Sequence, residues 1–189
     1  MDIKKQIQSY IPFNEQEGVD KQNMLSFIDS FDDVLTRNNR YGHFSASAFV
    51  VNEDLTKALI LHHNIFGGYV VPGGHADGEY DLYQVALREV NEETGLDVTP
   101  LIDNNIFAIQ ILPIKGHVKK GKYVSAHIHY DVLYLLVCKN EDMDKIRILE
   151  SENSNVKWCD LEDTYNKEAV DFIRPINEKI VKKVRSLKK

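Results

Sequence analysis

The sequence predicts a mixed α/β fold with helical segments at both ends of the chain. Apolar and β-branched runs typical of strands fill the region 43–163, and one strongly helical segment interrupts them at 80–94. No internal repeat or low-complexity linker divides the 189 residues. We therefore expect a single domain over 1–189, made of a helical extension (1–40), a core (43–165) and a C-terminal helix (166–189).

The N-terminal extension shows helical periodicity without a chemical motif. Met24, Phe27, Ile28 and Phe31 recur at steps of three and four residues, and Asn14 is a candidate cap before them. We expect this segment to pack on the core through its apolar side.

The core begins with a predicted hairpin and a helix. Segments 43–52 and 56–63 are rich in apolar residues, and turn-forming residues lie between them. The segment 80–94 has helical periodicity and ends at Gly95, which suits the residue after a helix C-terminus.

The second half of the chain continues with strands and a last helix. Segments 105–114 and 123–138 are expected to be long strands, and 156–163 a short strand that runs into a helix cap. The segment 166–188 carries an apolar helical stripe, which Pro175 is expected to kink or to split.

Composition narrows the class of protein. The net charge of −6 argues against binding to a nucleic-acid polymer, which depends on cationic contacts to phosphates. The two cysteines, Cys138 and Cys159, fit neither a disulfide framework nor a zinc spacing, so we expect free thiols in a reducing compartment. The N-terminus has no signal-peptide pattern and no run is long enough to span a membrane. We expect a cytoplasmic protein without a membrane partner.

Three carboxylates cluster in the stretch REVNEETG, residues 88–95. On a helix that turns about 100° per residue, Glu89 and Glu93 continue the apolar stripe that begins at Leu82. Glu92 continues the position of Val85 on the same count. A solvated acidic face should lie opposite the apolar stripe, so all three carboxylates are expected to face the body of the protein.

Inward carboxylates need a partner, because an uncompensated buried charge costs several kcal/mol. Arg88 can offset one of them. A divalent cation is the simplest remaining partner, and clustered carboxylate oxygens suit Mg²⁺ or Mn²⁺. Gly73 and Gly74, just before the helix, would let the backbone approach a phosphate closely, although a glycine pair alone usually marks a turn.

At this point the residues resemble a known family. The stretch 73–96, GGHADGEYDLYQVALREVNEETGL, is similar to the Nudix box, G-x5-E-x7-R-E-U-x-E-E-x-G-U, where U is aliphatic. One position departs from the pattern, because Tyr80 stands where the first glutamate is expected, and Glu79 precedes it. The positions in register are Gly74, Arg88, Glu89, Val90, Glu92, Glu93, Gly95 and Leu96.

The resemblance implies an α/β/α sandwich with a mixed sheet, and a hydrolase of nucleoside diphosphates linked to another group, X. Glu92 and Glu93 would bind Mg²⁺, Glu89 would complete the metal cluster or assist as a base, and Arg88 would orient a glutamate. The carbonyl of Gly73 would be a further metal ligand. A homodimer is possible, since dimers are common in the family. The open alternatives are a non-catalytic nucleotide-binding or sensing module, which the Tyr80 departure favours, and an isomerase of a diphosphate.

A second constellation lies in HIHYD, residues 127–131. His127, His129 and Asp131 alternate and so share one face of a strand. We expect this face to line a cleft, where the imidazoles contact phosphate or base or assist proton transfer. The alternative is an ordinary solvated strand face.

Two loops offer weaker candidates. Lys119, Lys120 and Lys122 could reach substrate phosphates, although a solvated hairpin tip is favoured. Glu150 and Glu152 lie in an acidic loop that could supply a catalytic carboxylate from outside the box, or form a polar turn.

Overall fold

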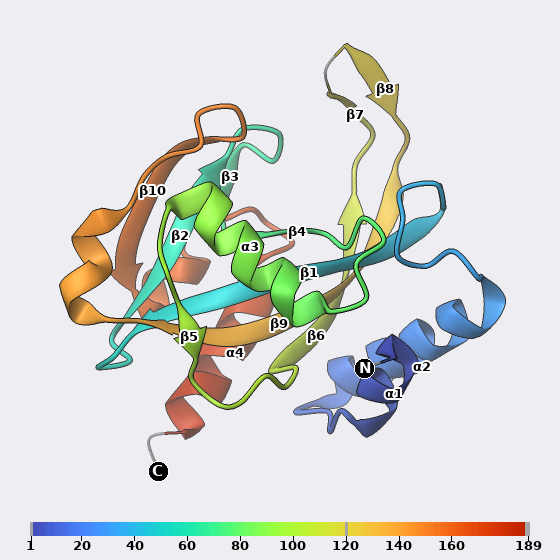
Figure 1. Ribbon diagram of the computed structural model, residues 1–189, viewed down its shortest axis with the longest axis horizontal. Coiled ribbons are helices and arrows are strands. Elements are labelled where there is room, and N and C mark those ends of the chain that lie inside the picture. Colours follow the sequence, from blue (N-terminus) through green and yellow to red (C-terminus); the bar gives the residue numbers. More distant parts are fainter. Residues whose placement is uncertain (1, 120, 188–189) are drawn as a thin grey trace.

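The structure, a computed structural model, describes residues 2–119 and 121–187 and is built on a curled mixed sheet between helices (Figure 1). Five strands run in the order β10-β2-β1-β9-β5, while β3 pairs with β2, β4 with β1 and β6 with β9. The predicted α/β fold class is confirmed. The strands are β1 (Gly42–Asn52), β2 (Lys57–His63), β3 (Gly68–Val70), β4 (Gly73–His75), β5 (Thr99–Pro100), β6 (Ala108–Ile114), β7 (His117–Lys119), β8 (Lys122–Val124), β9 (His127–Cys138) and β10 (Asn153–Asp160).

Strands β1 and β9 form the centre of the sheet. They pair in parallel over eleven positions, from Gly42 opposite Ile128 to Asn52 opposite Cys138. The predicted hairpin of the first two core strands is present as the antiparallel pair β1 and β2. The prediction of one strand over 123–138 is wrong, because β8 pairs with β7 in a separate two-stranded sheet and β9 starts only at His127.

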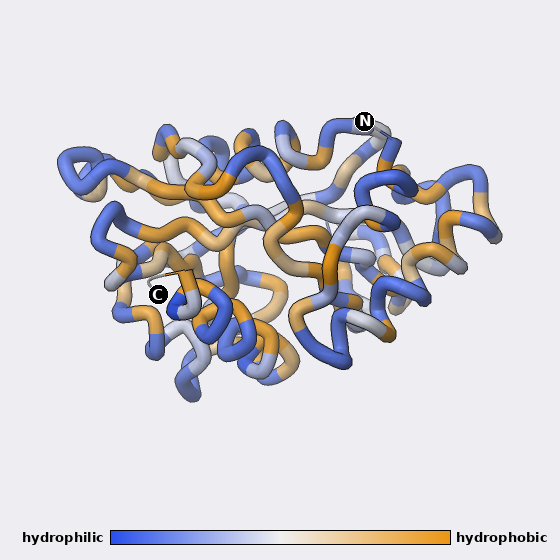
Figure 2. The backbone as a smooth tube through the Cα atoms, turned by 90° about the horizontal axis from the view of Figure 1, so that it is seen from below, coloured by the Kyte–Doolittle hydropathy of each residue, from blue (hydrophilic) through white to orange (hydrophobic). Residues whose placement is uncertain are grey.

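Helices cover both faces of this sheet. Helix α3 (Leu82–Thr94) packs on β1, β4 and β9, and helix α4 (Arg174–Ser186) lies behind them (Figure 1). Strand alternation explains the two cores: Ala48 and Val50 belong to the cluster that includes α3, whereas Phe49 and Val51 pack with residues of α4. Figure 2 shows hydrophobic segments running through the middle of the molecule.

The helix boundaries follow local chemistry. The Asp81 carboxylate accepts a hydrogen bond from the Gln84 amide at the start of α3, and Gly95 ends the helix with φ of 72°. Pro175 does not kink or split a longer helix as predicted; it lies in the first turn of α4, where a proline needs no amide hydrogen. Residues 166–173 precede this helix, and 188–189 lie outside the described residues.

The N-terminal extension consists of α1 (Ile3–Ser9) and α2 (Glu15–Ser30), which pack against each other and against β6. The side chain of Asn14 caps α2, as predicted. Fully buried Glu17 forms an ion pair of 3.0 Å with Lys179 of α4. Its other oxygen accepts hydrogen bonds from the Tyr10 hydroxyl and the Phe13 amide. The extension is thus fastened to the last helix of the core.

Two short 3₁₀ helices, η1 (Asn140–Lys145) and η2 (Leu161–Tyr165), flank β10. No helix among the described residues has the length and apolar character needed to cross a membrane.

The Glu17–Lys179 pair predicts a large stability loss on truncation. Glu17→Ala leaves the Lys179 ammonium buried without its carboxylate, so the free energy of unfolding should fall by about 3–5 kcal/mol. Urea unfolding measures this, with Glu15→Ala as control because Glu15 lies on the same helix, two residues earlier, and is exposed. Equal effects of the two substitutions would contradict the prediction.

Candidate active site

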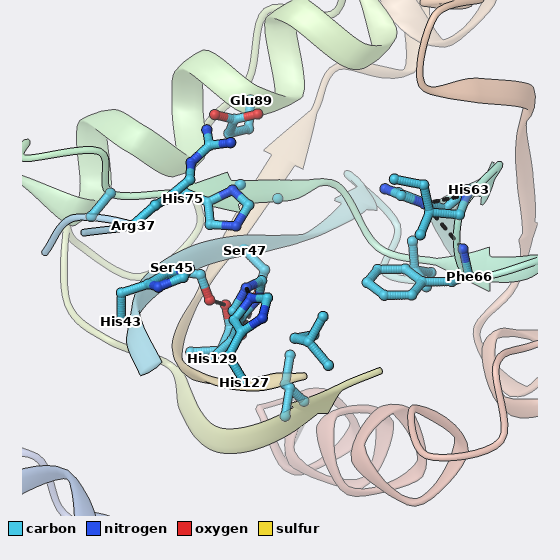
Figure 3. A pocket seen from close by; sticks show the side chains of 18 of the residues that line it. Arg37, His43, Ser45, Ser47, His63, Phe66, His75, Glu89, His127 and His129 are labelled. Carbon is cyan, nitrogen blue, oxygen red and sulfur yellow. Dashed lines mark hydrogen bonds between the residues drawn. The ribbon is translucent and has the colours of Figure 1, made fainter. Parts of the chain in front are cut away.

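A cleft of about 1190 Å³ opens between α3, β4, the start of β9 and the loops around them (Figure 3). Its lining includes most of the side chains singled out from the sequence. Those bordering it are Gly73, Gly74, Arg88, Glu89, Glu92, Glu93, His127, His129 and Asp131. The sequence-predicted candidates therefore surround one cavity, although they do not contribute to it equally.

Glu93 is the most deeply buried carboxylate of α3, with 3% of its surface exposed. It accepts hydrogen bonds from the Gly73 amide at 3.0 Å and from the Asn153 side-chain amide at 3.2 Å. Burial raises the pKa of Glu93 to about 7 despite these two donors. Burial disfavours the ionised form of this carboxylate, and a nearby cation would stabilise that form.

Glu89 lies one turn earlier and faces strand β4. A Cβ atom on Gly74 would fall 2.3 Å from the Glu89 carboxyl carbon, so glycine at this position lets the Glu89 carboxylate lie against β4. The Arg88 guanidinium donates to Glu89 at 3.1 Å. Burial raises the pKa of Glu89 against this favourable contact.

Glu92 corrects the expectation that all three carboxylates face the interior. Its side chain is 56% exposed and forms an ion pair with Arg88, with Nε at 3.8 Å. Glu92 lies about 80° from the centre of the apolar stripe. At this flank the helix borders the open cleft rather than the sheet, so the long side chain reaches solvent.

These carboxylates fit a divalent cation in donor type but are not gathered around one point. Burial is the main cause that raises the pKa of both groups, and neighbouring carboxylates add to it: Glu89 for Glu93, and Glu92 for Glu89, as expected for acids without a cation between them. Among the described residues, their oxygens do not belong to a group of three or more ligand atoms within 4.8 Å. Binding of a metal would therefore require side chains to move, above all the exposed Glu92.

Glu79 does not take the place of the box glutamate that is replaced by Tyr80. Tyr80 is 70% exposed. The Glu79 carboxylate accepts a hydrogen bond from the Asp81 amide at 3.0 Å, at the start of α3, and does not reach into the box.

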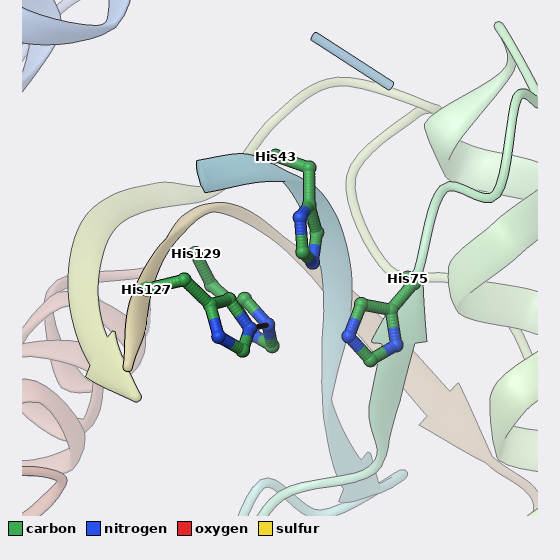
Figure 4. A group of neighbouring side chains, drawn as sticks. All are labelled: His43, His75, His127 and His129. Carbon is green, nitrogen blue, oxygen red and sulfur yellow. Dashed lines mark hydrogen bonds between the residues drawn. The ribbon is translucent and has the colours of Figure 1, made fainter. Parts of the chain in front are cut away.

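The histidines predicted from the sequence are joined by two that the prediction missed. His43 and His75 stand with His127 and His129 so that one ring nitrogen of each lies within 4.8 Å of those of the other three (Figure 4). His43 is the second residue of β1 and lies opposite His129 in the parallel register. The sequence carried no signal for this pairing, because alternation shows which residues share a face but not which strands are neighbours.

Burial keeps most of this cluster neutral. It lowers the pKa of His75 to about 3 and moves the pKa values of His43 and His129 below their ordinary value. The imidazoles of these residues therefore carry free lone pairs at neutral pH.

Asp131 shares the predicted face but has a structural environment. It is 3% exposed, and its oxygens accept hydrogen bonds from the Ser45 and Ser47 hydroxyls and the Gln110 amide. Burial raises its pKa. These bonds join β1, β9 and β6, so the carboxylate has little capacity left for a ligand, in contrast to the expectation from the sequence.

Other groups at the cleft come from loops. Glu152 borders the cavity, 3.8 Å from Lys119, whereas Glu150 is exposed outside it; Lys122 is exposed and Lys120 lies outside the described residues. Arg37, which sequence reasoning missed, enters from the N-terminal segment and pairs with Asp77 beside Glu89 (Figure 3).

The raised pKa of Glu93 predicts a pH-dependent stability in the metal-free protein. The unfolded carboxyl ionises near 4.5 and the folded one near 7, so the penalty grows as pH rises between these values and is complete above them. Glu93→Gln should therefore gain relative stability from pH 5 to pH 8, by up to about 3 kcal/mol. Urea unfolding in EDTA tests this; the exposed Glu92→Gln variant should show no such trend. A difference independent of pH would rule out this assignment.

The comparisons with known proteins agree with this geometry. The family model described as NUDIX domain matches residues 41–182. A probable DHNTP pyrophosphohydrolase of Lactococcus lactis is 26% identical over 147 residues, which cover 76% of this chain and 82% of the relative. Nudix hydrolase 25 of Arabidopsis thaliana is 29% identical over 142 residues, covering 70% and 80%.

Solved structures show the same fold. An Ap4A hydrolase of C. elegans in a binary complex superposes with a TM-score of 0.54 at 21% identity, covering 76% of this chain and 96% of that one. A NUDIX-family hydrolase of Clostridium perfringens gives 0.52 at 23% identity, covering 77% and 97%. The family match and these relatives support the predicted enzyme class. This class is a hydrolase of phosphoanhydride bonds that uses a divalent metal and acts on small nucleotide substrates. With its box on α3 and a family match over three quarters of its length, the chain belongs to the Nudix hydrolase family.

Proposed function

We propose that this protein is a Mg²⁺-dependent hydrolase that cleaves a phosphoanhydride bond in a nucleoside diphosphate linked to another group, X. The observation that carries the proposal is the position of Glu89 and Glu93. Two carboxylates with raised pKa values face a cleft beside the Gly73–Gly74 backbone, and the third box glutamate, Glu92, borders the same cleft.

The box residues would bind the metal and activate the attacking water. Glu92, Glu93 and Glu89, with the carbonyl of Gly73, would hold the cation, and Mn²⁺ could replace Mg²⁺ because both prefer oxygen ligands. When bound, the ion polarises a phosphoryl oxygen and lowers the pKa of a water. Glu89 is largely buried and has a raised pKa, which suits a group that accepts a proton from the attacking water.

Cationic side chains suit the charged part of the substrate. Arg88 holds Glu89, while Arg37 enters the cleft from the segment before β1 and Lys119 from the end of β7. Both also pair with carboxylates, Arg37 with Asp77 and Lys119 with Glu152 at 3.8 Å. A substrate phosphate could exchange with these pairs at little cost, because exposed ion pairs contribute little to stability.

The other end of the cleft suits an aromatic base or an apolar X. Phe66 and Phe172 stand edge to face, with ring centroids 6.1 Å apart, and His63 lies 4.5 Å from Phe66. All three border the cavity on the side away from the histidine cluster, as Figure 3 shows for His63 and Phe66. We therefore propose that phosphates lie along α3 while the base or X contacts this aromatic pair.

Three further expectations remain predictions: one domain over 1–189, a homodimer, and a cytoplasmic location. That His127 and His129 contact the substrate also stays a prediction.

A nucleotide panel tests the proposed reaction. It should include Ap4A and DHNTP, which name the activities of two similar proteins, together with nucleoside diphosphates bearing sugars or other groups. With Mg²⁺, the wild type should release phosphate or a nucleoside monophosphate from at least one compound. The Glu92→Gln, Glu93→Gln double variant should be slower by at least about 100-fold, since changes to groups that merely orient metal ligands already cost about 10–100-fold.

The control is Glu150→Gln, which changes an exposed carboxylate outside the cleft. Equal rates for the wild type and the double variant on every compound would contradict the proposed function. Tight nucleotide binding without turnover would identify a sensing module, and product analysis would reveal an isomerase.

Gly74 gives an independent prediction about positioning. In Gly74→Ala the new methyl group would overlap the Glu89 carboxyl group, so this side chain must move. A displacement of about 1 Å can cost about 100-fold in rate, and we expect a loss of this order in kcat. Gly18→Ala is the matched control, because nothing lies within 4 Å of a Cβ at that helical position. An unchanged kcat in Gly74→Ala would show that the Glu89 position is not critical.

A further inference from the structure

The four-histidine cluster is separate from the carboxylate site. Strand β4 lies between the two: Gly74 faces Glu89 of α3, whereas its neighbour His75 points to the opposite side, toward His43 and His129 (Figure 4). The box glutamates are oxygen donors and the cluster contains only nitrogen donors. The two groups therefore favour different ions.

The arrangement of the rings converges on a point. Their ligand nitrogens all lie within 4.8 Å of one another. His127 Nε2 and His129 Nε2 are 3.0 Å apart and share a hydrogen bond, in which a bound ion would take the place of the proton on His129. Nitrogens around a tetrahedral ion with bonds of about 2.0–2.1 Å lie about 3.3–3.4 Å apart, so small side-chain rotations suffice to enclose an ion.

His43 has a buried ring nitrogen that is free to bind a ligand. It is 4% exposed, and its Nδ1–H faces the carbonyl oxygen of Asn39 at 3.4 Å. With the proton on Nδ1, its buried Nε2 presents a lone pair for which the described residues offer no hydrogen-bond partner. A buried acceptor without a partner is destabilising, and a cation on this nitrogen would remove the penalty.

The hydrogen bonds that two of these imidazoles donate to backbone carbonyl oxygens are typical of metal-binding histidines. His127 Nδ1–H donates to the Ser125 carbonyl at 2.8 Å, as His43 Nδ1–H faces Asn39. Such a bond fixes the tautomer and aims Nε2 inward. The cluster also borders the cleft, which provides a path for an ion to enter.

We propose that His43, His75, His127 and His129 form a binding site for a borderline transition-metal dication such as Zn²⁺, distinct from the Mg²⁺ site of the box. Four imidazoles complete a tetrahedral set, which is characteristic of structural ions. The ion joins β1, β4 and β9 at the floor of the cleft and fixes the strand that carries Gly73 and Gly74. This proposal does not depend on the hydrolytic reaction.

The test uses metal binding by the full chain. The metal-free wild type, titrated with Co²⁺ in the presence of millimolar Mg²⁺, should take up one equivalent and develop the intense visible absorption of a tetrahedral centre. Zn²⁺ should displace the Co²⁺ and raise the melting temperature. Elemental analysis after dialysis should find one Zn²⁺ per chain.

Variants separate the histidine site from other sites. His43→Ala and His127→Ala should each weaken Zn²⁺ binding by at least about 100-fold, since loss of an outer partner alone costs about 10–100-fold. His62→Ala, outside the cluster, and Glu92→Gln, in the box, should bind Zn²⁺ as the wild type does. Circular dichroism checks the fold, and the more exposed His127 provides a variant that does not open the core.

Three results would overturn the proposal. These are a wild type that retains no Zn²⁺ or Co²⁺, a weak octahedral Co²⁺ spectrum, and binding that survives both histidine substitutions. Loss of hydrolysis in the nucleotide panel would leave the proposal unaffected, because none of these measurements depends on turnover.

Discussion

The parallel pairing of β1 with β9 is the constraint on which the rest of the structure depends. The two strands run side by side over eleven positions, and Gly42 makes the close approach possible because a Cβ there would fall 2.7 Å from the Ile128 carbonyl oxygen. The register places Ser45 opposite Asp131, so that this buried carboxylate is held by Ser45, Ser47 and Gln110. A shift of one residue would turn every side chain of the strand to the other face.

This register fixes the chemistry on both faces of the sheet. On one face, alternating residues such as Ala46 and Ala48 leave room for α3, whose carboxylates then lie against β4. On the other face, the same alternation brings His43 beside His129. The short strand β4 separates the two environments, and its glycines permit close contacts, Gly73 with Ser47 and Gly74 with the Glu89 carboxylate.

Much of this architecture could be predicted from the sequence, and the exceptions have physical causes. Helix α3 was predictable because its apolar stripe and Gly95 are local signals. The break before His127 was not, since Ser125 and Ala126 interrupt a segment whose composition still favours strand. Helical angles placed Glu93 correctly in the interior but failed for Glu92, because they cannot show where a neighbouring sheet ends. Contacts that require distant segments to meet, such as Arg37 beside Glu89, carried no sequence signal.

The carboxylates of α3 and the four imidazoles would hold their ions in different ways. Buried carboxylates with raised pKa values repel each other and favour a hard cation, which exchanges readily and is completed by substrate phosphates. Neutral imidazoles held by backbone carbonyls favour a borderline ion and can enclose it fully. A closed ion at the floor would stiffen β4 without competing for substrate, while the carboxylate site keeps positions open for it. Because the Gly73 amide contacts Glu93, a change in the position of β4 reaches the carboxylates directly.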